Sequence, residues 1–293
     1  MTSVPRWLVK KASRYAVALG ACPRRLLASR SAASNPTLRV LMYHHLRRAD
    51  RDPFSVAPEA FDRQMKWLAD RRLAVSLATL EEHVAAAGPV DGVLVTIDDG
   101  YRDLRTVGLP ILRRHRVPAV AFVSVGRIEE RSGSLENSTG EAYLSWTELA
   151  ELAAAGVTIA SHGWDHVSLT ALEPSQMISQ VTRSRRLLEQ RLGVTINAFA
   201  YPFGTRSDFN DATRRALSDA GYTVAFTTQH GAVRYGADTL ALPRLKVEGG
   251  EGMWMFRQVV TGGLDGWGLV DRFLWRLQDS SPVRPHVTNG ISL

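Results

Sequence analysis

The chain has 293 residues, of which 45% are hydrophobic, and a single cysteine, Cys22. This length and composition allow a large buried core, in one sizeable α/β domain or two small ones. A lone cysteine excludes an internal disulfide and a cysteine-based structural zinc site, so any metal must be held by histidine and carboxylate side chains. The net charge of +7 suits nucleic acid or an anionic membrane, but the arginines are scattered and no nucleic-acid-binding module is recognisable, so we expect no nucleic-acid partner.

Residues 1–36 are rich in arginine, lysine, alanine and serine and contain no acidic residue, so we expect a basic extension ahead of the main domain. The apolar stretch 15–19 is short for a secretory signal, although LGAC at 19–22 resembles a weak lipoprotein cleavage box. We favour a basic amphipathic segment on a membrane surface over export, and a disordered tail is an equal alternative. The expected location is therefore membrane-associated or cytoplasmic. No run of eighteen apolar residues occurs, which argues against a spanning helix.

Beyond Pro36, short apolar runs alternate with segments of helical periodicity. The runs that predict strands are residues 39–46, 92–100, 119–126, 157–163, 197–204, 222–228 and 240–247. Apolar residues at three- and four-residue spacing predict helices at residues 57–72, 103–115, 145–156, 174–193 and 209–221. Strands separated by helices indicate parallel pairing, and about seven strands without a glycine-rich phosphate fingerprint favour a (β/α) barrel over a doubly wound sheet. We expect this α/β barrel to occupy residues 37–262.

Polar side chains cluster at the carboxyl ends of four predicted strands. They are His44 and His45, Asp98 and Asp99, Ser161 and His162, and residues 201–204. In a parallel barrel these strand ends form one face, so the side chains should converge in a shared pocket. Two adjacent aspartates repel each other when both are ionised, so their presence at a strand end needs a chemical reason.

His162 and His166 lie four residues apart directly after a predicted buried strand, so both imidazoles can reach one ion. With one carboxylate they make a set suited to zinc or another divalent transition metal, with positions left open for water and substrate. One of the paired aspartates can then be a ligand, while the other takes a proton from the attacking water. A pair of surface histidines without a metal is the alternative interpretation.

The motifs TIDDG at 96–100 and SHGWDH at 161–166 resemble the TFDDG and HSxxH motifs of polysaccharide deacetylases of the NodB-homology type. The resemblance covers roughly residues 38–250 and implies a distorted (β/α) barrel of about seven strands. It implies that Asp98 is the general base and that Asp99, His162 and His166 are the metal ligands. Zinc is the metal expected first, with cobalt, nickel or iron as alternatives. The implied activity is metal-assisted removal of acetyl groups, usually from N-acetylated sugars.

Typical members of this family carry a late LxH motif whose histidine is the general acid, whereas residues 242–247 here read LPRLKV. The motifs are similar instead to those of the branch that contains the poly-N-acetylglucosamine deacetylases, in which an early YH strand supplies the acid. MYHHL at 42–46 fits that pattern, so we predict His44 as the acid that protonates the leaving amine, with His45 as the alternative. The alternative for either residue is a histidine of the core whose ring is hydrogen-bonded to backbone groups and has no catalytic role.

The oxyanion of acyl hydrolysis needs hydrogen-bond donors, and the turn YPFG at 201–204 can offer a backbone N–H. Pro202 has none, so we expect Phe203 to be the donor, with Tyr201 beside it at the substrate site; a plain tight turn is the alternative. Arg244 is expected to hold Asp98 ionised and oriented, in place of the arginine of the typical motif, unless it is a surface residue.

The carboxyl-terminal part of the chain is rich in aromatic residues, including Trp254, Trp267 and Trp275. We expect this density to pack over the barrel or to contact a lipid interface, with residues 263–293 as a separate segment and a disordered end from residue 281. Together with the basic extension, this suggests peripheral membrane contact and a lipid-linked sugar as one substrate class.

Two classes of function fit the motifs, an enzyme and a binding module. The first is a metal-dependent deacetylase acting on an N-acetylated glycan or glycolipid, and an O-acetyl esterase or a deformylase of a lipid-linked sugar would use the same residues. The second is a carbohydrate-binding barrel that keeps the fold without turnover. The presence of Asp98 beside a metal set favours an enzyme, because a binding module needs no base there. The choice of sugar depends on loops, and the oligomeric state is open.

Overall fold

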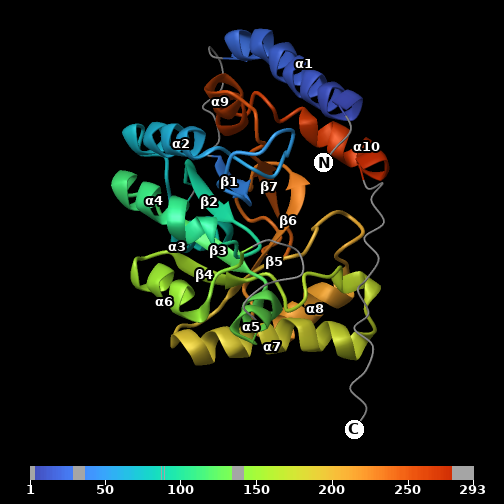
Figure 1. Ribbon diagram of the computed structural model, residues 1–293. Coiled ribbons are helices and arrows are strands. Elements are labelled where there is room, and N and C mark those ends of the chain that lie inside the picture. Colours follow the sequence, from blue (N-terminus) through green and yellow to red (C-terminus); the bar gives the residue numbers. More distant parts are fainter. Residues whose placement is uncertain (1–3, 29–36, 87, 89, 134–141, 279–293) are drawn as a thin grey trace.

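A computed structural model describes residues 4–28, 37–86, 88, 90–133 and 142–278. Seven parallel strands close into a barrel in which each strand pairs with the next in the chain and the last pairs with the first (Figure 1). The strands are β1 (Leu38–Tyr43), β2 (Gly92–Ile97), β3 (Ala119–Val123), β4 (Thr158–Ser161), β5 (Ala198–Ala200), β6 (Val224–His230) and β7 (Leu242–Lys246). Each lies within or close to a predicted run, which confirms the seven-stranded barrel.

Strand residues alternate between two buried hydrophobic clusters. Val40, Leu94 and Phe122 belong to the smaller cluster, which fills the barrel, while Leu41 and Val95 belong to the larger one between strands and helices. Because both faces of every strand are buried, the strands are nearly continuous apolar runs in the sequence. The same alternation, continued past the strand ends, directs one residue in two toward the open end of the barrel.

Helices cover the outside of the barrel and mostly lie in the predicted segments. They are α2 (Pro58–Asp70), α4 (Leu109–His115) preceded by a π-helical turn η1 (Leu104–Gly108), α6 (Trp146–Ala154), α7 (Pro174–Leu192) and α8 (Asp211–Asp219). Ser145 and Glu148 form a capping box at the start of α6. Gly193 ends α7 in a left-handed conformation with φ 67°. A short η2 (Leu169–Ala171) lies between β4 and α7.

Two helices that lie between β1 and β7 were not predicted. The eight-residue α3 (Leu77–Val84) packs Leu77, Leu80 and Val84 against the interior cluster. Its only start signal is the Ser76 hydroxyl, which accepts a hydrogen bond from the Thr79 N–H. The other is α5 (Val125–Gly133), which begins inside the run assigned to the third strand. Apolar periodicity does not separate a short buried helix from a strand.

The basic amino-terminal segment contains a long helix, α1 (Val4–Ala28), that packs on the barrel beside α9 (Met253–Thr261), as Figure 1 shows. Arg14 is only 1% exposed, and its Nε donates to Glu251 Oε1 at 2.7 Å. Tyr15 stacks on Trp254 with ring centroids 5.6 Å apart. A disordered tail is therefore the wrong interpretation for residues 4–28.

The carboxyl-terminal aromatic segment is helical as well. Met255, Phe256 and Trp267 are buried, the first two in α9 and the third at the start of α10 (Trp267–Gln278). The predicted disordered end from residue 281 lies outside the described residues. Within the described part of the chain, none of the helices combines the length and the apolar character needed to span a membrane.

We expect Arg14→Met to lower the free energy of unfolding by about 3 kcal/mol, because it removes a buried partner from Glu248 and Glu251. Burial raises the pKa of Glu248, but Arg14 and neighbouring lysines outweigh burial and hold it well below the usual 4.5. Glu248 therefore contributes stability above pH 4.5, and this contribution is lost progressively as the pH falls below that value.

Urea unfolding at neutral and acidic pH measures this effect. Lys66→Met is the control, because the ion pair of Lys66 with Asp70 is exposed and should contribute about 0.5 kcal/mol or less. An effect of Arg14→Met no larger than that of the control, or one that grows in acid, would contradict the buried role of Arg14.

Candidate active site

Three potential metal ligands meet at the carboxyl ends of β2 and β4. Asp99 follows β2, whereas His162 and His166 follow β4. The Nε2 atoms of His162 and His166 lie 3.3 and 3.2 Å from Oδ1 of Asp99. One ligand atom from each residue lies within 4.8 Å of the other two. Among the described residues, this is the one group of three or more histidine and carboxylate side chains with such geometry.

The donor atoms of this group fit a divalent transition metal. Oδ1 of Asp99 is buried and makes no hydrogen bond of good geometry within the described part of the chain, although both imidazoles face it. Nδ1 of His162 lies 2.7 Å from the carbonyl oxygen of Ala200, so Nδ1 carries the proton and Nε2 presents its lone pair. One carboxylate and two imidazoles suit zinc and its neighbours.

The backbone around the group adopts conformations that non-glycine residues avoid. Asp99, His166 and Phe203 have φ values of 72°, 55° and 60°. Such left-handed residues cost about 1–3 kcal/mol each and persist where the surrounding structure holds them. Gly100 continues the same turn with φ 80°, and a Cβ there would lie 3.2 Å from Val123 Cγ1. With these backbone conformations, the Asp99 and His166 side chains point toward each other, and Nε2 of His166 lies 3.2 Å from Oδ1 of Asp99.

Asp98 lies beside the metal group and is held by Arg244 of β7. Nη1 of Arg244 donates to Oδ1 of Asp98 at 2.7 Å and to Oγ1 of Thr96 at 3.2 Å, and its Nε donates to the carbonyl of Thr227. Both charged groups are almost fully buried, so a surface position for Arg244 is excluded. Arg244 therefore contacts the carboxylate as expected and orients it from inside the barrel.

His44 and His45 have different surroundings. Asp98 N–H donates to the carbonyl of Tyr43 at 2.9 Å, which puts the next residue, His44, at the neighbouring strand end. Burial lowers the pKa of His44 to about 4, while Asp99 and Asp98 act to raise it. His45 instead stacks on the loop residue Tyr101, with its Nδ1 3.0 Å from Oδ2 of Asp103. The geometry associates His44, and not His45, with the two aspartates.

The turn after β5 contributes Phe203 but not Tyr201. The Phe203 ring is 38% exposed and lies 4.9 Å from the ring of His166. No hydrogen bond from its N–H to another described residue is present. The prediction for Tyr201 is wrong, because this side chain is fully buried and its hydroxyl donates to the carbonyl of Leu240. Its N–H is also engaged, by the carbonyl of Phe226.

Lys246 is a residue of this region that was not among the predicted site residues. It ends β7 two positions after Arg244, so both face the same side of the strand. Its Nζ lies 3.1 Å from the ring centroid of Phe54, and that ring packs edge-on against His44. Burial lowers the pKa of Lys246 to about 7. The two-residue period of the last strand was the signal that could have identified it.

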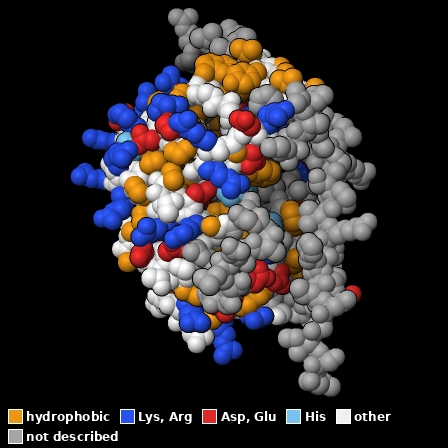
Figure 2. Space-filling view, viewed as in Figure 1, with side chains coloured by type: hydrophobic (Ala, Val, Ile, Leu, Met, Phe, Trp, Pro, Cys, Tyr) orange, Lys and Arg blue, Asp and Glu red, His pale blue; other side chains and the backbone are white. Residues whose placement is uncertain are grey.

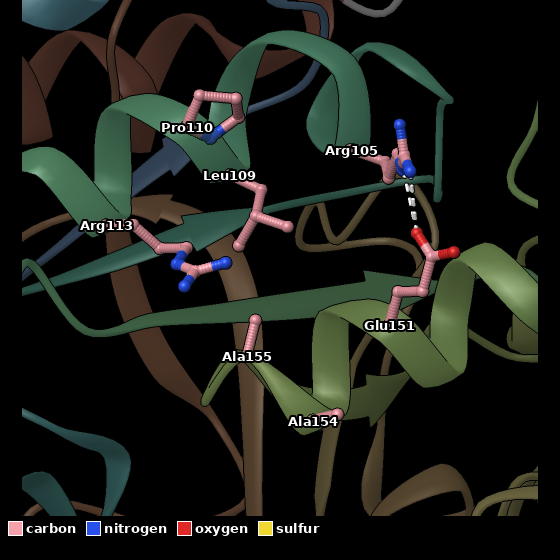
Figure 3. Close-up of a pocket in the computed structure, with 7 residues that line it drawn as sticks. All are labelled: Arg105, Leu109, Pro110, Arg113, Glu151, Ala154 and Ala155. Atoms are coloured by element: carbon pink, nitrogen blue, oxygen red, sulfur yellow. Dashed lines mark hydrogen bonds and ion pairs between the residues drawn. The ribbon is translucent and has the colours of Figure 1, made fainter.

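A separate pocket lies on the outer surface of the barrel, between α4 and α6 (Figure 3). Its lining is Arg105, Leu109, Pro110, Arg113, Glu151, Ala154 and Ala155, and Nη2 of Arg105 pairs with Oε2 of Glu151 at 2.9 Å. It contains none of the predicted site residues and lacks a metal-ligand set. The strand-end cluster is therefore the stronger candidate for catalysis.

This chain is similar to several known proteins. Residues 86–225 match the family model described as polysaccharide deacetylase. The Bacillus subtilis protein YxkH is 29% identical over 216 residues, covering 73% of this chain and 72% of that protein. A Staphylococcus aureus poly-beta-1,6-N-acetyl-D-glucosamine N-deacetylase is 24% identical over 207 residues, covering 66% and 68%. The structure of the Streptococcus pyogenes deacetylase PplD in complex with acetate aligns with a TM-score of 0.67 at 23% identity, over 78% of this chain and 99% of that one. The last comparison establishes a shared fold.

Proposed function

We propose that this chain, which belongs to the polysaccharide deacetylase family, is a metal-dependent hydrolase that removes acetyl groups from N-acetylated sugars of a polysaccharide or glycolipid. The observation that carries the proposal is the convergence of Asp99, His162 and His166 on one point with a second carboxylate, Asp98, beside them. A ligand set with an adjacent base is the arrangement that metal-assisted hydrolysis needs.

Asp99, His162 and His166 would hold the metal, for which zinc is favoured and cobalt, nickel or iron are alternatives. When bound, such an ion polarises the acetyl carbonyl and lowers the pKa of a water molecule. Asp98 takes the proton from the attacking water. Because the hydrogen bond from Arg244 reaches Oδ1 of Asp98, the second oxygen is left for this proton.

His44 delivers a proton to the nitrogen of the leaving amine. Since burial lowers its pKa to about 4, the free protein holds His44 neutral at pH 7, and the proton must arrive during the reaction. Asp98, which gains a proton from water, stands at the adjoining strand end. The Phe203 N–H faces no acceptor among the described residues and serves as a donor to the oxyanion.

We expect the wild-type protein to bind about one divalent ion per chain, and Asp99→Ala and His162→Ala to lose most of it, because each removes one of three ligands. Elemental analysis of the dialysed proteins measures the ion. His45→Ala is the control and should keep its metal, because that imidazole pairs with Asp103. Full occupancy in both ligand variants, with folding verified by circular dichroism, would refute the assignment.

The substrate class is tested by measuring acetate and formate released from acetylated oligosaccharides and lipid-linked sugars. The proposal expects acetate from N-acetylated glucosamine oligomers, with loss of release in the Asp99→Ala variant. Release from O-acetyl groups alone, or of formate alone, would select the esterase or the deformylase. Sugar binding by the metal-loaded wild type without any release would select a non-catalytic barrel.

A further inference from the structure

Helix α1 exposes a stripe of apolar side chains to solvent. In the stretch 8–21, whose side chains the structure describes, the exposed residues are Leu8, Val9, Ala12, Ala16, Leu19 and Gly20. Leu8, Val9 and Leu19 are 52%, 68% and 59% exposed. At 100° per residue these six positions form one continuous stripe along the helix. A surface helix of a globular protein normally has the opposite arrangement, with its apolar stripe against the core.

The charged side chains of α1 lie on the face that packs against the protein, next to the buried Ala18. Lys11 and Arg14 are buried, and their side chains lie against Glu248 and Glu251 in the segment after β7. Lys10 pairs with Glu248 at 2.7 Å. Rotating the helix to bury the apolar stripe would leave the two glutamates buried without partners, which is costly. The ion pairs therefore fix the outward direction of the apolar stripe.

The neighbouring helices α9 and α10 also carry exposed apolar side chains and positive charge. Trp254 of α9 is 41% exposed and stacks on Tyr15, and Leu269 of α10 is 62% exposed. Arg257 and Arg272 are exposed three residues after Trp254 and Leu269, on the same sides of their helices. Figure 2 shows hydrophobic side chains gathered at the top of the molecule, where α1 lies. Apolar and aromatic side chains flanked by arginine are typical of a lipid interface.

We propose that the outward stripe of α1, together with Trp254 and Leu269, docks this protein on an anionic membrane surface. The helix then lies in the interface with its apolar side in the lipid, and the exposed arginines face the anionic headgroups. The sequence predicts a basic amphipathic segment on a membrane surface, and the structure gives the basic residues of that segment a different task. Lys11 and Arg14 are used inside the protein instead.

A second copy of the chain fits this surface less well. The stripe is about 20 Å long and about 10 Å wide, whereas a stable interface buries about 800 Å² on each partner. Two-fold pairing of the surface would also bring arginines of like charge together. Membrane binding needs no complementary protein surface; its strength increases with the apolar area buried, and an anionic membrane supplies the negative charge that complements the arginines.

The test is flotation of the purified full-length protein with phosphatidylcholine vesicles that contain phosphatidylglycerol, and with phosphatidylcholine vesicles alone. We expect binding to the anionic vesicles, and a loss of about tenfold or more in binding for the double variant Leu8→Glu, Leu19→Glu. Ile178→Glu on α7 is the matched control, because Ile178 is 50% exposed but lies on another helix, and it should bind as the wild type does.

Release of acetate from a soluble oligosaccharide, and the unfolding transition, should be the same in all three proteins, so a failure of membrane binding is distinct from a failure of the proposed activity. The proposal is overturned if the wild type does not float with anionic vesicles, or if the double variant floats equally well. It is also overturned if light scattering shows a dimer that the double variant dissociates, since the stripe would then be a contact between copies.

Discussion

Asp98→Asn should keep its metal and lose on the order of a hundredfold or more in deacetylation rate, as expected when a general base is removed. The amide retains an oxygen that can accept the hydrogen bond from Arg244, so the geometry around Thr96 and Arg244 is preserved. What it loses is the ability to take a proton from water. The measurements are the turnover number on an N-acetylated oligosaccharide and the metal content of the same sample.

Asp103→Asn is the matched control for this variant. Asp103 is another carboxylate that follows β2, but it pairs with His45 rather than with Arg244. Its substitution should leave most of the activity. Near-normal turnover of Asp98→Asn, or loss of its metal, would show that Asp98 is not the base or that it is a ligand.

His44→Ala should reduce N-deacetylation by roughly a hundredfold or more while sparing metal binding and much of the activity on an activated acetyl ester. An amide nitrogen must be protonated as it leaves, whereas a good leaving group departs without that proton. The measurement compares turnover on an N-acetylated oligosaccharide with turnover on the activated ester, for the same enzyme preparation.

His45→Ala serves as the control because His45 stacks on Tyr101 and pairs with Asp103, away from the paired aspartates. It should leave the ratio of the two activities near that of the wild type. If the damage falls on His45, or equally on both substrates, His44 is not the acid.

The barrel and its metal group were accessible from the sequence for a physical reason. Parallel strands buried on both faces leave uninterrupted apolar runs, and the helices between them carry a different period. Asp99, His162 and His166 follow such runs directly, and in a closed parallel barrel all strand ends share one face. Local pattern and topology therefore agree on where these side chains meet.

Side-chain direction in the short elements was decided only by the tertiary structure. β5 has three residues, too few for alternation to show which side faces the barrel, and Tyr201 proved to be buried instead of facing substrate. Helix α3 was not predicted because it is also short. Its eight residues are placed by packing against the interior cluster.

Helix α1 shows most clearly the difference between what the sequence determines and what the tertiary structure decides. Its sequence determined an amphipathic helix with one charged and one apolar side, because residue order sets which side chains share a face. It did not determine which of the two sides turns inward. That was decided by Glu248 and Glu251, more than two hundred residues further along the chain, whose buried carboxylates need the cations of Lys11 and Arg14. Long-range electrostatic pairing thus reversed the orientation that hydrophobic burial alone would favour.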